Sequence, residues 1–324
     1  FNDLTLQISL FRPGPMKGNM ISPYLDGRHG FIQPDYFHPD LKPILEESYG
    51  VVVFHEQLMK IMKVMTGCSL AKADEMRRKM SKPNLKEEIE AYFKQSSLAR
   101  GYQLSVVNRV WQVLEGFGSF GFCKAHGAAF ALPTYQSAWL KTHYPAEFIA
   151  GLLTHDPGMY PKRLLLAEAR RLGVELLPID VNRSTDEYRV EKTRNSKGVR
   201  MAIGEIAGIS TPEVSRIIRK APFRDIADFY TRARPSRKTI MRLAAIGALD
   251  SLSENATRGD VIQKVREITT KLAPKIHSSQ IELDFIISEE LPQGNPEFDR
   301  DQQLEQEVGL TGMDISGHIL DKYQ

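Results

Sequence analysis

A single loop gathers the residues of this chain that are best suited to ligand chemistry. Residues 116–127 contain four glycines and three phenylalanines, together with Lys124 and His126. Glycine lets a backbone approach a ligand closely, aromatic faces offer flat bases a surface for stacking, and the other two residues add a cation and a titratable ring. The loop predicts a site for a ligand with a base and a phosphate, although a buried turn between two helices explains the same residues equally well.

A second group of cations ends a predicted helix and consists of Arg77, Arg78 and Lys79. Asp74 and Glu75 lie four residues before Arg78 and Lys79, so these two cations could simply form surface ion pairs. Arg77 has an alanine at that spacing, and we expect it to be freer to reach a ligand. The helix dipole also favours cations at this end without any function, so composition alone favours a structural role.

A glycine turn followed by an amphipathic helix predicts a contact with DNA. The turn consists of Gly208, Ile209 and Ser210. The helix after it carries the cations Arg216, Arg219 and Lys220. Backbone N–H groups at such a helix start can bind a DNA phosphate, although an ordinary loop entering a helix has the same pattern. Residues 243–249 could supply a second turn of this kind.

The segment 280–285 reads Gln-Ile-Glu-Leu-Asp-Phe and lies within a stretch rich in helix breakers, 274–296, which we interpret as a linker. An extended peptide could place Leu283 and Phe285 in an apolar groove of a partner while Gln280 makes polar contacts. Apolar side chains in an acidic linker favour this interpretation over a short strand or a chance match.

The charge is unevenly distributed along the 324 residues, although the net charge is only +3. Residues 56–143 contain 13 Lys and Arg against 7 Asp and Glu, and residues 200–249 contain 10 against 4. Residues 278–310 contain 1 against 9. Two basic blocks with an acidic end indicate a body that binds a polyanion and an end that is solvated or binds a partner.

The cysteines and the apolar runs indicate a cytoplasmic protein. Cys68 and Cys123 have no ligand spacing, so neither a disulfide framework nor a zinc site is expected. No apolar run reaches the roughly 18 residues that cross a bilayer, and we expect no membrane partner. The chain begins at Phe1, without a signal peptide, which suggests a segment of a longer protein.

Helical periodicity dominates the chain. In 55–66 apolar residues recur at the spacing of one helix face, and a helical pattern with Pro133 inside it occupies 128–141. A buried strand is predicted over 174–181, and a hairpin pairs 187–192 with 198–202. No catalytic residue or metal ligand is evident, because no clustered carboxylates, phosphate-binding loop or nucleophile motif is found.

Six stretches of this chain resemble the alpha subunit of bacterial DNA polymerase III, the C-family replicative polymerase. The resemblance extends from about Leu10 to the C-terminus. The matching stretches are 10–16, 49–57, 73–80, 121–126, 135–141 and 143–148. The segment 153–164 is more similar to the error-prone, damage-tolerant branch of the family.

The resemblance implies a mainly α, multidomain fold. Residues 1–203 would form the polymerase fingers with a small β element, 204–273 a tandem helix-hairpin-helix region, and 274–324 a linker with the sliding-clamp motif and the start of a C-terminal region. The family's palm, with its catalytic aspartates, would precede Phe1, so we expect this segment to be inactive alone. The Mg²⁺ ions of the full-length enzyme would have their ligands outside this chain.

The resemblance also implies roles for individual residues. Arg77 and Arg78 would face the triphosphate of the incoming nucleotide, where fixed guanidinium groups stabilise charge. The residues expected to line the pocket near the nascent base pair are Phe120, Gly121, Lys124 and His126. Those expected to contact DNA are Lys79, Gly208, Ile209, Ser210, Arg216, Arg219 and Lys220. Those expected to bind the clamp are Gln280, Leu283, Asp284 and Phe285.

This sequence departs from the family pattern at a few of these positions. Phe120, Cys123 and Ala125 stand where the family often has Tyr, Asn and Ser, and each change removes a polar group. We hypothesise looser hydrogen-bond checking of the base pair, as suits an error-prone enzyme. Ser210 stands where the family usually has glycine, which puts close phosphate contact there in question.

The resemblance implies one function, and the residues alone allow a second. The first is template-directed nucleotide addition, with error-prone or translesion synthesis as its expected setting. The expected partners are primer-template DNA, the incoming dNTP, the sliding clamp and other replisome or mutasome proteins. The alternative is a non-enzymatic adaptor that binds DNA and clamp. Paired aspartates encoded upstream of Phe1 would favour the enzyme, and a nearby start codon would favour the adaptor.

Overall fold

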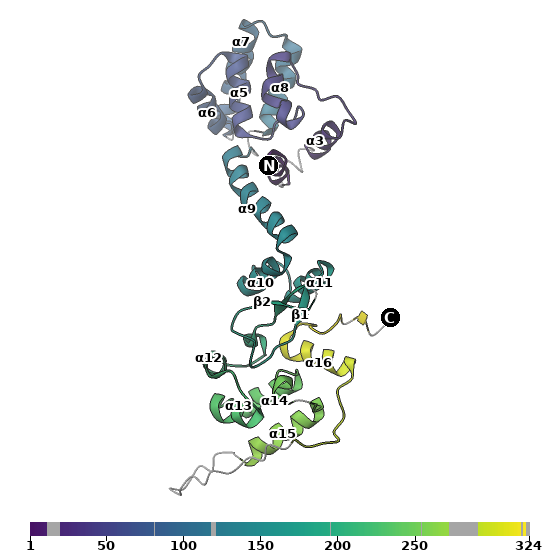
Figure 1. The fold of residues 1–324 in the computed structure, drawn as a ribbon. Coiled ribbons are helices and arrows are strands. Elements are labelled where there is room, and N and C mark those ends of the chain that lie inside the picture. Colours follow the sequence, from purple (N-terminus) through teal and green to yellow (C-terminus); the bar gives the residue numbers. More distant parts are fainter. Residues whose placement is uncertain are drawn as a thin grey trace. The chain divides into compact units, whose positions relative to one another are not determined.

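The computed structural model describes residues 1–11, 20–80, 82–117, 121–194, 196–253, 255–271, 291–318 and 320–321. The chain divides into two compact units, Phe1–Ala138 and Trp139–Gln324. Figure 1 shows the first in purple to blue and the second in teal to yellow. Helices make up most of both units and a small sheet lies in the second, which confirms the predicted mainly α, multidomain fold.

The first unit is built from helices alone, apart from short 3-10 turns, within its described residues. Its helices are α1 (Asn2–Leu10), α3 (Ile21–Arg28), α4 (Lys42–Leu45), α5 (His55–Thr66), α6 (Leu70–Lys79), α7 (Pro83–Ala99), α8 (Leu104–Phe117) and α9 (Lys124–His143), with the 3-10 turns η1 (Pro39–Leu41) and η2 (Glu46–Ser48). Helix α9 contains the division between the two units, and Pro133 lies inside it without ending it.

The predicted apolar faces form the core of the first unit. On α5 the side chains of Leu58, Ile61, Met62 and Met65 are all buried, as the helical spacing predicts. The corresponding stripe of α8 centres on Trp111, which contacts Phe93 of α7 at a ring distance of 5.6 Å. Helix α5 packs on α6 and α7, and α7 packs on α8.

Local signals set the ends of α5 and α6 as predicted. Gly67 follows α5 with a φ of +75°, a conformation that suits glycine. The Ser69 hydroxyl accepts a hydrogen bond from the N–H of Lys72 at 3.2 Å and so caps α6. Pro83 begins α7, where its missing N–H has no consequence.

The second unit combines helices with one three-stranded sheet. Its elements are α10 (Pro145–His155), α11 (Lys162–Arg171), β1 (Glu175–Leu177), β2 (Arg189–Lys192), β3 (Lys197–Arg200), η3 (Ile203–Glu205), α12 (Thr211–Lys220), α13 (Ile226–Ala233), α14 (Arg237–Ala245), η4 (Asp250–Leu252), α15 (Arg258–Lys271) and α16 (Arg300–Thr311). The strand order is β1-β3-β2, with β1 parallel and β2 antiparallel to β3. The predicted hairpin is thus confirmed.

The predicted strand over 174–181 is wrong in its length, because β1 contains three residues only. Pro178 follows directly and has no N–H to donate to a ladder. Its carbonyl accepts a hydrogen bond from the Arg200 side chain at 2.7 Å instead of continuing the sheet. The chain then turns at Asp180, whose carboxylate accepts from the N–H of Asn182 at 2.7 Å.

The apolar residues of the second unit form one contiguous core that runs from α10 and the sheet to α15. Val199 of β3, Ile217 of α12 and Phe229 of α13 are completely buried in it. None of the described helices is both long and apolar enough to cross a membrane. The predicted boundaries after residues 203 and 273 stay predictions, because compact packing does not define functional regions.

Candidate functional site

The three cations at the end of α6 are held by two carboxylates of the same helix. Arg77 donates from Nε and Nη2 to Oδ1 of Asp74 at 3.0 and 2.9 Å, and Arg78 donates from Nη2 to Oδ2 at 2.5 Å. These bonds, first that from Arg78 and then that from Arg77, lower the pKa of the Asp74 carboxyl. Lys79 pairs with Glu75 at 2.6 Å, as its spacing predicts.

The expectation that Arg77 is the freer arginine is wrong. It pairs with Asp74 three residues earlier, a spacing that also brings side chains together on a helix. Its side chain is only 20% exposed, whereas that of Arg78 is 71% exposed. Arg78 therefore presents the more accessible guanidinium to a ligand, and Arg77 supports the carboxylate between them.

Lys124 does not stand in a loop but begins helix α9. Its Nζ lies 2.5 Å from the Glu47 carboxylate and 5.5 Å from the centre of the Phe54 ring. Its backbone N–H donates to the two carboxylate oxygens of Glu56 at 3.0 and 3.2 Å. The start of α9 thus already has an anionic partner, and a phosphate would compete with Glu47 for the lysine.

The imidazole of His126 lies between two aromatic rings. Its centre is 5.2 Å from that of Phe122 and 4.7 Å from that of Phe130, the latter edge to face. His126 and Phe130 are both exposed. Such an exposed aromatic group offers a surface on which a base can stack.

At Gly121 the chain approaches the start of α5 closely. An added Cβ would overlap the ring of His55 and lie 2.6 Å from Cε1 of Phe117. The next residue, Phe122, accepts a hydrogen bond from the N–H of His55 at 2.8 Å and forms a bridge with Phe54. Glycine is required here for packing against the chain itself. Phe120 lies outside the described residues.

Helices α5 to α8 run alternately in opposite directions, and this brings both cation groups to one end of the bundle. At one end Arg100, after α7, lies over Gly67, after α5. At the other end Lys86 of α7 pairs with Glu115 of α8. Only three residues separate the end of α6 from the start of α7, so the end of α6 lies at this second end. His55, at the start of α5, and Gly121, which lies against it, are at the same end.

The predicted glycine turn of the second unit is confirmed in its geometry. Gly208 has a φ of +72°, and Ser210 caps α12. Ile209 packs against the core, so its apolar side chain is structural. The N–H of Ser210 donates to the Glu213 carboxylate at 3.2 Å, so an acceptor already occupies one of the groups predicted to bind phosphate.

Glu213 joins the starts of two helices, and the sequence analysis missed it. One carboxylate oxygen accepts from Ser210, and the other accepts from the N–H of Ser236, which caps α14, at 2.8 Å. Burial acts to raise the pKa of Glu213, but the hydrogen bonds from Ser236 and Ser210 outweigh it and lower the pKa to about 2. The spacing of serine and glutamate three residues apart is a capping-box pattern and could have revealed it.

The cations of α12 do not share one role. Arg216 donates from Nε to the Ala233 carbonyl at 3.1 Å and from Nη2 to that of Arg234 at 3.3 Å, so it satisfies the end of α13. Arg219 and Lys220 lie exposed in the last turn of α12, and within the described residues neither forms an ion pair. They are the predicted DNA contacts that remain available to a phosphate.

The two glycine turns of this region have matching environments. Arg242 of α14 lies over Gly208 and donates to the Ala207 carbonyl. In the second turn Arg258 lies over Gly247, whose φ is +79°. In each turn a guanidinium covers the glycine, which leaves no space for a side chain there.

The clamp motif and the metal ligands are the last two predictions to compare with the structure. Gln280, Leu283, Asp284 and Phe285 lie outside the described residues, so the clamp motif stays a prediction. Among the residues that the structure describes, no group of three or more His, Cys, Asp or Glu side chains could hold a metal ion.

The fold is that of a mainly helical, multidomain protein, and comparison with known proteins identifies the family. Residues 1–100 match the bacterial DNA polymerase III alpha subunit finger domain, and residues 173–259 match the helix-hairpin-helix motif. The chain belongs to the family of the bacterial DNA polymerase III alpha subunit.

Relatives from both branches of the family are similar to this chain. The error-prone DNA polymerases of Symbiobacterium thermophilum and Teredinibacter turnerae are each 37% identical over 79% of the chain and 26% of their own length. The DNA polymerase III subunit alpha of Campylobacter jejuni is 30% identical over 100% of the chain and 28% of its own length. The chain thus spans less than a third of these relatives, and the higher identities support the error-prone branch.

Proposed function

We propose that this chain is part of a DNA-directed DNA polymerase and supplies contacts to the incoming nucleotide, to duplex DNA and to the sliding clamp. The nucleotide role is supported chiefly by the grouping of cations and an aromatic ring at one end of the first unit's helical bundle. There the exposed Arg78 at the end of α6 lies at the same end of the bundle as the start of α9, which carries the ammonium group of Lys124 and the exposed ring of His126. Cations and an aromatic surface together suit a nucleoside triphosphate.

These side chains would act by positioning and by compensating charge. Phosphoryl transfer in general depends on fixed positive groups around the phosphates. Arg78 would bind triphosphate oxygens by exchanging its bond with Asp74, and Lys124 by exchanging its pair with Glu47. In the full-length enzyme Mg²⁺ would neutralise charge on the triphosphate, held by residues outside this chain.

In the second unit the two glycine turns and the end of α12 would bind the DNA backbone without reading its sequence. Arg219 and Lys220 supply exposed charge there. Residues 280–285 would tether the sliding clamp, and a cytoplasmic replisome or mutasome is the expected setting. The lost polar groups at Phe120, Cys123 and Ala125 support a role in error-prone or translesion synthesis, because they reduce hydrogen bonding to the nascent pair.

Binding of the chain to primer-template DNA across a salt series, with and without the matched dNTP, tests this proposal. We expect steep salt dependence and tighter binding with the matched nucleotide. The variant Arg78→Ala should abolish the nucleotide effect and leave DNA binding unchanged. Arg171→Ala is a matched control, because Arg171 is an exposed arginine of α11 that, like Arg78, pairs with a carboxylate earlier on its own helix.

The outcomes separate the proposal from its alternative. If DNA binds with the expected salt dependence but the nucleotide has no effect, the chain acts as a DNA and clamp tether. If Arg171→Ala reduces the nucleotide effect as much as Arg78→Ala does, the end of α6 has no special role.

A further inference from the structure

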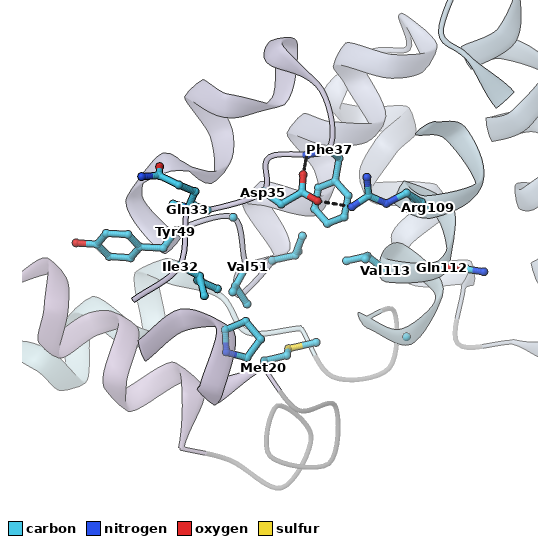
Figure 2. A pocket seen from close by; sticks show the side chains of 15 residues that line it. Met20, Ile32, Gln33, Asp35, Phe37, Tyr49, Val51, Arg109, Gln112 and Val113 are labelled. Carbon is cyan, nitrogen blue, oxygen red and sulfur yellow. Dashed lines mark hydrogen bonds and ion pairs between the residues drawn. The ribbon is translucent and has the colours of Figure 1, made fainter. Parts of the chain in front are cut away.

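The first unit contains a cavity of about 520 Å³ that the nucleotide and DNA contacts do not use. It lies between residues 32–37, residues 49–52 and one side of α8. Most of its wall is apolar, and Figure 2 shows Met20, Ile32, Val51 and Val113 around the space. Its volume is within the range of ligand pockets, roughly 300–1,000 Å³.

A pair of opposite charges forms one side of this cavity. Asp35 accepts a hydrogen bond from Arg109, as the dashed line in Figure 2 marks. Asp35 also accepts from the N–H of Phe37 at 2.8 Å, and the Arg109 guanidinium lies 5.2 Å from the centre of the Phe37 ring. The bond from Phe37 and then that from Arg109 lower the pKa of Asp35, which keeps it ionised.

These features define the chemistry of a suitable ligand. The two charges compensate each other at the surface, so the cavity has no net charge that would attract a charged ligand. A neutral amide or hydroxyl group can donate to Asp35 and accept from Arg109 at once. We propose that the cavity binds an uncharged, mainly apolar molecule, which packs against Ile32, Val51 and Val113 and places one such polar group on the Asp35–Arg109 pair.

The wall of the cavity continues directly into the chain around Gly121. Val52 lies two residues before Phe54, which forms the bridge with Phe122. Gly116, at another part of the wall, precedes Phe117, whose ring contacts the position of Gly121. A ligand in the cavity therefore contacts the two segments that position residues 121–124, and its binding shifts the conformation of that turn.

The first test is a fluorescence titration of the 324-residue chain with Nile red, an uncharged aromatic dye. We expect saturable binding at one site. Val113→Trp should fill the cavity and weaken binding at least about tenfold. Ser105→Trp, at an exposed position of the same helix, is the control and should bind the dye as the parent chain does.

A second pair of variants does not disturb the core. Ile32 is 47% exposed and lines the cavity, whereas its neighbour Phe31 is 76% exposed and does not line it. Ile32→Ala should weaken dye binding about fivefold through lost apolar contact, and Phe31→Ala should leave it unchanged. Absence of saturable binding, or equal losses within either pair, overturns the cavity as a ligand site.

The link to the turn has its own readout, the rate at which a thiol reagent modifies Cys123. This cysteine is exposed, and its Sγ lies 3.6 Å from the Glu56 carboxylate. Saturating Nile red should change its rate at least about twofold, while Cys68, which packs near α5 and α6, serves as an internal reference in the same sample. Dye binding without a change at Cys123 overturns the link. Neither the dye titration nor the thiol reaction involves nucleotide or DNA. A failure of the proposed polymerase function would therefore leave the results of both measurements unchanged.

Discussion

The ends of α6 and α12 carry similar cations in opposite electrostatic settings. On α6 every cation of the last turn has a carboxylate partner on the same helix, at Asp74 or Glu75. The one carboxylate on α12 itself, Glu213, accepts from the backbone at the helix start, and Arg219 and Lys220 form no ion pair within the described residues. Similar composition thus produces a compensated cluster in one unit and uncompensated charge in the other.

This difference in charge compensation changes how strongly each helix end attracts a polyanion. Uncompensated surface charge attracts any phosphate backbone, with strong salt dependence. A compensated cluster adds little to such general attraction, because a phosphate must first displace a carboxylate. The α6 cluster therefore suits a ligand that is positioned by other contacts, such as a nucleotide, whereas α12 suits a duplex of any sequence.

The largest expected effect comes from the carboxylate of α12. Glu213→Ala removes the buried carboxylate that accepts from both Ser210 and Ser236, so the N–H groups at two helix starts lose this partner. We expect the free energy of opening of α12 and α14 to fall by about 3 kcal/mol, measured by hydrogen exchange of their amides. Glu75→Ala on α6 is the control and should change the exchange there little, because its ion pairs are exposed. Equal effects would remove the distinction between the two helices.

The same carboxylate should make the second unit sensitive to acid. The pKa of Glu213 is lowered from 4.5 to about 2 in the folded protein. Its contribution to stability is present above the unfolded value, and it is lost as the pH falls from about 4.5 toward 2. Hydrogen exchange in α12 should accelerate over that window, and Glu213→Gln should flatten this dependence. An unchanged pH profile in the variant would assign the acid sensitivity to other groups.

Removal of the exposed cations of α12 should affect DNA binding directly. The double variant Arg219→Ala and Lys220→Ala should reduce the salt dependence of DNA affinity by about two in slope, since each lost phosphate contact contributes about 0.9. The control is Arg171→Ala with Lys192→Ala, which removes the same charge from exposed positions elsewhere in the second unit. A slope that both doubles reduce alike would mean that net charge, rather than the end of α12, sets the affinity.

The sequence predicted the positions of the helices better than it predicted the contacts between their side chains. Helical spacing predicted the buried face of α5 and the ends marked by Gly67 and Ser69, because these signals are local. The length of β1 was overestimated, because an apolar run does not show where Pro178 interrupts pairing. The reading of Arg77 failed because only the spacing of four residues was considered.

The contacts that Glu213 and Arg216 make with other helices could not be predicted from the sequence of α12 alone. Both side chains contact backbone groups of elements that come later in the chain, at Ser236 and Ala233. Residue spacing within one helix predicts which side chains are neighbours on that helix. It does not show which backbone groups of other helices need a hydrogen-bond partner. The capping pattern alone indicated half of the contacts of Glu213.

A smaller effect should come from removing the compensation on α6. Asp74→Asn takes away the negative charge that holds Arg77 and Arg78, so both guanidinium groups gain freedom to bind phosphate. We expect the affinity for a deoxynucleoside triphosphate to rise about two- to fivefold, the size of an exposed ion pair, in a calorimetric titration. Glu75→Gln is the matched control, because it removes the same charge from the same helix but releases Lys72 and Lys79 instead. A rise confined to Asp74→Asn would show that the two arginines bind the triphosphate and that Asp74 holds them back. An equal rise in both variants would reduce α6 to a general basic surface like that of α12.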